Sequence, residues 1–95
     1  MKRGPSLDRL KPRLTLIRLD GPFTTDRRLT PTIRPVGVFS LRVQCDADVT
    51  VYLRVDTQTH IYSGRDFEAS LPAFANRPIR MEVTGPANGV VEIVR

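Results

Sequence analysis

The sequence has one cysteine, one histidine and no tryptophan among 95 residues. A single cysteine excludes a disulfide within the chain and a zinc site built from several cysteines. No apolar run approaches the roughly eighteen residues that span a membrane as a helix. The first twenty residues hold no continuous apolar segment of the kind that signal peptides need. We therefore expect a globular protein without disulfides, without a multi-cysteine metal centre and without a membrane partner.

Basic residues and prolines are concentrated in the first third. Residues 1–34 carry nine basic side chains against three aspartates, a net charge of +6, whereas the remaining residues carry −1. A long helix is excluded there by recurring prolines, each of which lacks an N–H donor and restricts the preceding residue: Pro5, Pro12, Pro22, Pro31 and Pro35. The pattern predicts an extended, basic, Pro/Arg-rich arm over residues 1–35 and a separate domain over residues 36–95.

Apolar and polar residues alternate beyond the arm, which is typical of half-buried strands. The clearest strand is 49–55, with four aliphatic residues on one face and Tyr52 and Arg54 on the other. Further strands are predicted over 36–43, 60–62, 66–71, 78–84 and 90–94, with turns at 45–48, 56–59 and 63–65.

The predicted strands also indicate which side chains face inward. Phe67 and Ala69 are expected to face the core from 66–71, while 78–84 is expected to expose Arg80 and Glu82. The last two strands are predicted to form a hairpin around the Gly85–Gly89 loop. Short strands at this spacing predict an all-β fold, a small antiparallel β-sandwich or jelly-roll-like domain preceded by the arm.

Groups suited to catalysis are few. Cys45 and His60 would need folding to bring them together as a thiol–imidazole pair, and nothing near Cys45 suggests an oxyanion hole. Asp46 and Asp48 form an Asp-x-Asp step, but the glycine and glutamate of an EF-hand loop are missing. No phosphate loop or dinucleotide fingerprint is present. We predict no catalytic residues, no metal site and no cofactor, and therefore no enzyme.

The arm is expected to bind other proteins. It could neutralise phosphates, but its single aromatic residue, Phe23, gives bases little to stack on, so nucleic acid is an alternative rather than the first expectation. Carbohydrate binding is a second alternative, for which Tyr52 and Tyr62 are the aromatic candidates. The residues predicted to contact a partner are Arg13, Leu14, Leu16, Ile17, Arg18, Leu19, Arg27, Arg28 and Arg34.

The stretch from Val49 to Val94 resembles a small β module of structural proteins in tailed bacteriophages. The residues that carry the resemblance are 51–56 (VYLRVD), 61–64 (IYSG), Phe67, 71–74 (LPAF), Arg77, 80–85 (RMEVTG) and 91–94 (VEIV). The resemblance implies a virion structural protein, either a tail or head–tail accessory protein or a capsid cement (decoration) protein. Its partners would be capsid, portal, adaptor or tail subunits, and it would be present as a homo-oligomer or in many copies.

Overall fold

The computed structural model describes residues 14–95, and every regular element in this part of the chain is a β-strand. The strands are β1 (Thr15–Asp20), β2 (Arg28–Leu29), β3 (Val36–Gly37), β4 (Ser40–Val55), β5 (Gln58–Ser70), β6 (Phe74–Ala75), β7 (Ile79–Thr84) and β8 (Gly89–Val94). All the strand pairs are antiparallel. Residues 14–95 contain no helix that could cross a membrane. The predicted all-β, sandwich-like fold is confirmed.

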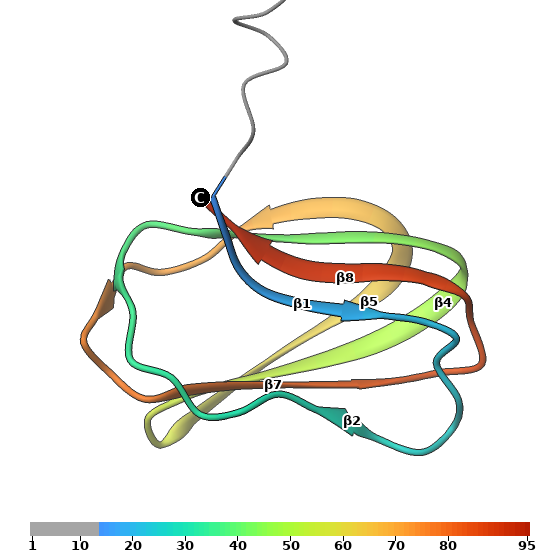
Figure 1. Cartoon of the computed structure of the whole chain (residues 1–95), viewed down its shortest axis with the longest axis horizontal. Helices are drawn as coiled ribbons and strands as arrows, with labels where there is room; N and C mark the ends of the chain where they lie inside the picture. Colours follow the sequence, from blue (N-terminus) through green and yellow to red (C-terminus); the bar gives the residue numbers. More distant parts are fainter. Residues whose placement is uncertain (1–13) are drawn as a thin grey trace, which may run out of the picture.

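The main sheet is organised around β4 (Figure 1). β5 pairs with β4 along one edge, while β8 and β7 pair with its first and second halves along the other. β1 then pairs with β8, and β2 pairs with β7. Isolated bridges between Phe23 and Ala87 and between Ile33 and Ile79 extend the two pairings, so that residues 15–33 run alongside residues 79–94. The paired segments therefore run side by side, and each of them bends at about the middle of β4, where its pairing with β8 ends and its pairing with β7 begins.

The change of direction is centred on a bulge in β4. Four residues of β4, Cys45 to Asp48, lie opposite the single residue Arg65 of β5. Additional residues on one strand bend an antiparallel ladder and increase its twist. The turns predicted at 45–48 and 63–65 are therefore wrong as chain reversals, because the strands bend there and continue. The reversal at Asp56 and Thr57 is present, and it joins β4 to β5.

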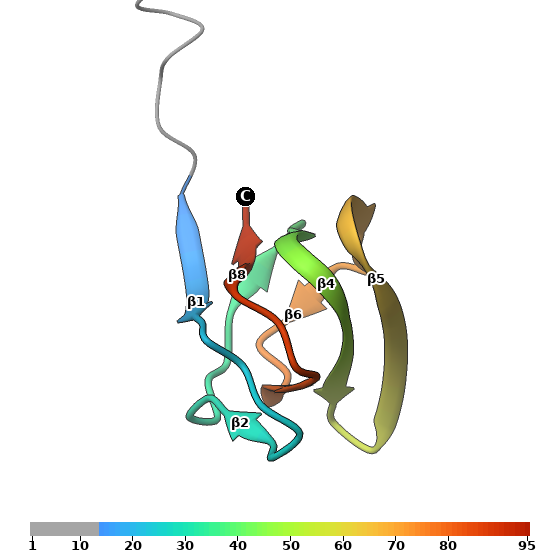
Figure 2. The same ribbon diagram turned by 90° about the vertical axis from the view of Figure 1, so that its right-hand side faces the viewer.

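The bend divides the sheet into two layers (Figures 1 and 2). The first half of β4 lies with β8 and β1, and the second half lies with β7 and β2. The hairpin predicted from the last two strands is wrong, because β7 and β8 pair with different halves of β4. The loop between them carries the chain from one layer to the other. Where it enters β8, Gly89 has a φ of 150°, and a Cβ there would overlap the carbonyl oxygen of Gln44.

The core fills the space between the layers. Its fully buried side chains come mostly from the faces that alternation predicted and include Leu41, Val43, Val51, Leu53, Ile79, Met81, Val83, Val91 and Ile93. The rings of Phe39 and Phe74 pack with centroids 5.7 Å apart beside the β3–β6 pair. β5 differs from the other long strands, because Phe67 and Ala69 are only half-buried. An edge strand has neighbours on one side only, so alternation alone does not bury its inward face.

Residues 14–35 belong to the domain, which corrects the predicted boundary between residues 35 and 36. The N–H of Phe23 donates to the carbonyl of Ala87 at 2.6 Å, and the N–H of Thr30 donates to that of Met81 at 3.0 Å. Ile17 and Phe23 are core residues, 8% and 3% exposed. Prolines exclude helix but permit sheet-edge segments, which need donors on one side only. Residues 1–13 of the predicted arm lie outside the described residues.

Candidate functional site

The apolar residues predicted to anchor a partner lie on or just before β1. Ile17 is buried, and Leu16 and Leu19 are half-buried against the same core. Leu14 is 58% exposed, and its carbonyl oxygen accepts the N–H of Arg95 at 2.8 Å. Arg13 lies outside the described residues. Ile17 is therefore a core residue of the protein's own fold rather than a surface anchor, and Leu16 and Leu19 pack partly against the same core.

Three of the predicted partner-binding arginines lie on the surface and bond to neighbouring groups of this chain. Arg18 Nε donates to Asp20 Oδ1 at 2.9 Å, and this hydrogen bond raises the pKa of Arg18 above the ordinary value of an arginine. Arg28 donates to the carbonyl of Pro22 at 3.4 Å, and its guanidinium carbon lies 5.8 Å from the ring centroid of Phe23. Arg34 donates to the carbonyl of Asn76 at 3.3 Å. Each of these three side chains thus has a different bonding partner within the chain.

Arg27 lies in a cluster that the sequence did not reveal. Its Nη1 lies 3.2 Å from Glu82 Oε1, and its guanidinium carbon lies 5.3 Å from the ring centroid of Tyr52. Arg54 Nε lies 3.3 Å from the other carboxylate oxygen of Glu82. The Glu82 side chain is only 6% exposed as a result. The prediction that Glu82 is exposed is therefore wrong: it does point away from the core, but two arginines cover it.

We call this surface the arginine face and define it as Arg27, Leu29, Tyr52, Arg54 and Arg80. Strand register places these residues around Glu82 on the outer side of β2, β7 and β4: Leu29 and Tyr52 lie opposite Glu82, and Arg54 lies opposite Arg80. Three arginines surround one glutamate, which pairs with two of them, Arg27 and Arg54, so the positive charges exceed the negative by two. Within residues 14–95, no carboxylate forms an ion pair with Arg80.

Sequence reasoning placed Tyr52, Arg54 and Arg80 on outward faces but did not connect them. Alternation identifies the face of a strand on which a side chain lies, whereas contact across strands depends on register. No short-range signal pairs Arg54 with Arg80 or brings Arg27 to Glu82. The arginine face therefore depends on the register between distant strands and cannot be inferred from the local sequence.

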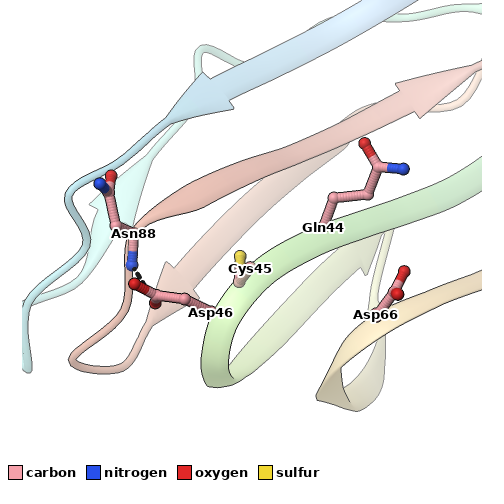
Figure 3. A pocket seen from close by; sticks show the side chains of 5 residues that line it. All are labelled: Gln44, Cys45, Asp46, Asp66 and Asn88. Carbon is pink, nitrogen blue, oxygen red and sulfur yellow. Dashed lines mark hydrogen bonds between the residues drawn. The ribbon is translucent and has the colours of Figure 1, made fainter.

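A separate hollow of about 330 Å³ lies at the bend of the sheet, lined by Gln44, Cys45, Asp46, Asp66 and Asn88 (Figure 3). Asp46 Oδ1 accepts the N–H of Asn88 at 2.8 Å, and Asp46 donates its own N–H to the carbonyl of Asn88 at 3.0 Å. Asp48 pairs instead with Arg65 at 3.0 Å. The two aspartates of the Asp-x-Asp step thus connect the bend of β4 to Asn88 and to Arg65 of β5. No group of three or more His, Cys, Asp and Glu suited to a metal occurs in the described part of the chain.

Cys45 and His60 lie at different positions along the β4–β5 pair. Cys45 belongs to the bend, whereas His60 on β5 lies opposite Leu53, eight residues further along β4. The thiol of Cys45 donates to the carbonyl of Val90 at 3.9 Å, and burial raises its pKa. A raised pKa lowers the thiolate fraction at neutral pH and so weakens the thiol as a nucleophile. The arrangement does not form the thiol–imidazole pair considered from the sequence.

No family model, curated protein or solved structure matches this chain. The arginine face is therefore judged on its own geometry. Arginine and tyrosine are enriched in protein–protein interfaces, and the planar guanidinium suits paired contacts with carboxylates. Leu29, 48% exposed, adds an apolar contact beside the charged groups. The face can therefore form paired contacts with carboxylates.

Proposed function

We propose that this protein is a non-enzymatic structural component of a larger protein assembly and that it docks through the arginine face. The observation that carries the proposal is the placement of Arg54 directly opposite Arg80. Like charges opposite one another destabilise a sheet, so the isolated chain gains nothing from this pair. An acidic partner surface would turn the unfavourable pair into a binding site.

The geometry favours a protein over a nucleic acid as the partner. Tyr52 is the aromatic residue of the face, and its ring already lies against the guanidinium of Arg27. It is therefore poorly placed to stack on a base, which single-stranded nucleic acid sites usually require. Carboxylates need no stacking platform, and Arg54 and Arg80 offer them adjacent guanidinium groups.

The assembly that we propose is a bacteriophage particle. This step rests on the resemblance of residues 49–94 to a module of tailed-phage structural proteins, and that stretch contains Tyr52, Arg54, Arg80 and Glu82. The chain would be a tail or head–tail accessory protein or a capsid cement protein. Docking through residues 14–35 as an unfolded arm is not part of the proposal, because these residues pair within the domain.

The experiment is quantitative mass spectrometry of purified particles of the bacteriophage that encodes the chain. We expect the protein in the particles at a fixed ratio to the major subunits. A ratio matching the shell would indicate a cement protein, and a ratio matching one ring would indicate the tail. Particles that lack the protein would contradict the virion proposal.

The docking face is tested by comparing Arg80→Glu with Arg77→Glu, which makes the same charge change outside the face. Arg80→Glu places a carboxylate opposite Arg54 and should leave the fold intact, while incorporation into particles falls at least about tenfold, as expected for loss of one charged interface contact. Arg77→Glu should be incorporated normally. Equal incorporation of both variants would rule out the arginine face. Retardation of DNA at low salt that Arg80→Glu abolishes would instead favour nucleic-acid binding.

A further inference from the structure

β5 leaves one edge of the sheet open. It runs for 13 residues and, within residues 14–95, has β4 as its single neighbour. None of its residues is buried. In an antiparallel strand, alternate residues direct their N–H and C=O groups away from the neighbour, so this edge presents unpaired backbone donors and acceptors.

The two halves of this edge differ in protection. Gln58–Ser63 contains no Lys, Arg, Asp, Glu, Pro or Gly, and it includes the strand-favouring residues Thr59, Ile61 and Tyr62. The second half carries Arg65, Asp66 and Glu68 beside the bulge of β4. Charges and bulges are the features with which proteins prevent edge pairing. The first half lacks both, and its Ile61 is 62% exposed.

We propose that a second copy of this chain pairs with the first along Gln58–Gly64, in an antiparallel arrangement with a two-fold axis at Ile61. In this register Ile61 lies opposite Ile61 of the second copy. Thr59 lies opposite Ser63 of that copy, and His60 lies opposite its Tyr62. Ile61 thus meets an apolar side chain and Thr59 meets a hydroxyl, as in stabilising cross-strand pairs. The contact is isologous, and it continues the sheet from one copy into the other.

Charge opposes most of the corresponding arrangements in the second half of β5. An axis at Arg65, Asp66 or Glu68 would place that residue opposite itself in the second copy. An axis at Phe67 would place Asp66 opposite Glu68. Each of these registers sets like charges directly opposite one another, which destabilises strand pairing. The sequence of β5 thus favours self-pairing in one half and opposes it in the other.

This dimer uses a different strand from the proposed docking function, although Ile61 lies directly beside Tyr52 of the arginine face. The pairing edge belongs to β5, whereas the arginine face lies over β2, β7 and the second half of β4. An Arg80→Glu variant should dimerise like the unmodified chain even when it no longer docks. Loss of one property without the other therefore identifies which proposal has failed.

The first test is the molecular mass of the full chain, measured by light scattering over a range of concentrations. We expect the mass to rise from 10.7 kDa towards twice that value. Ile61→Lys, which sets two lysines opposite one another, should keep the protein monomeric at every concentration. Val38→Lys is the matched control, because Val38 is 63% exposed but lies outside β5. It should dimerise like the unmodified chain.

The second test examines the register. In a Cys45→Ser background, Ile61→Cys should form a disulfide-linked dimer under mild oxidation, because the axis brings the two sulfur atoms together. Ser70→Cys on the same strand should remain largely monomeric. A chain that stays monomeric at its highest soluble concentration, or a dimer unaffected by Ile61→Lys, would overturn the proposal. Preferential cross-linking at Ser70→Cys would do the same.

Discussion

The carboxylate of Glu82 forms an ion pair with Arg27 at 3.2 Å, although the two residues are 55 positions apart in the chain. Glu82 lies on β7, and Arg27 immediately precedes β2. The pair therefore fastens a segment of the predicted arm to the central part of the sheet. Because Arg54 binds the other oxygen of the same carboxylate, one buried acid organises two of the three arginines of the face.

Replacing Glu82 by glutamine should destabilise the fold by about 1–2 kcal/mol, measured by urea unfolding. The change preserves the shape of the side chain but leaves Arg27 and Arg54 without their counter-charge, and hydrogen bonds to charged groups contribute about this much. Both arginines are more than half exposed, which keeps the expected loss small. Asp48→Asn is the control, because it removes an exposed pair with Arg65 and should change stability by less than about 0.5 kcal/mol. Equal losses in the two variants would contradict the organising role of Glu82.

Amide hydrogen exchange in the isolated chain should show that residues 14–35 are folded. The N–H groups of Phe23, Thr30 and Ile33 donate to backbone carbonyls of the domain, so their exchange should be slowed at least about a hundredfold relative to an unstructured peptide. Thr32 has no hydrogen bond within the described residues, and its amide should exchange rapidly. Fast exchange at all four amides would restore the original hypothesis of an arm that becomes ordered only on a partner.

Alanine at Gly89 should destabilise the fold more than alanine at Gly37. Both glycines have positive φ, so both substitutions introduce backbone strain of about 1–3 kcal/mol. At Gly37 the nearest atom to a new Cβ is 3.6 Å away, whereas at Gly89 the Cβ would overlap the Gln44 carbonyl and lie 2.6 Å from the Cα of Cys45. We expect an additional loss of about 2 kcal/mol or more at Gly89, measured by urea unfolding. Similar losses at the two sites would show that β8 and the bend of β4 are not in close contact.

Alkylation of Cys45 by iodoacetamide should reach its half-maximal rate at a higher pH in the folded chain than in the chain unfolded in urea. Burial raises the pKa of the thiol, and the thiolate is the species that reacts. Folding therefore favours the neutral thiol. This contribution to stability is complete below the thiol pKa of the unfolded chain, about 8.5. It is lost as the pH rises through the higher thiol pKa of the folded chain. A folded-state midpoint at or below that of the unfolded chain would contradict the assignment.

Residues 49–55 and 66–71 show how far alternation could predict this fold. Both segments alternate, and both form strands with the expected faces. Val51 and Leu53 are fully buried, whereas Phe67 and Ala69 are only half-buried. The difference arises because β4 has neighbours on both edges and β5 has one. The sequence pattern contains no information about that difference.

Local residue order by itself determined that residues 14–95 are built from strands, which side of most long strands faces inward, and that no long helix forms over residues 14–35. These properties follow from alternation and from proline, and both act over a few residues. Tertiary structure decided that residues 14–35 complete the sheet, that Arg54 faces Arg80, and that β7 and β8 occupy separate layers. Backbone hydrogen bonds are nearly the same for every residue type, so they do not encode which distant strand becomes a neighbour. The neighbour of each strand is set instead by the arrangement that buries the apolar faces of all the strands together.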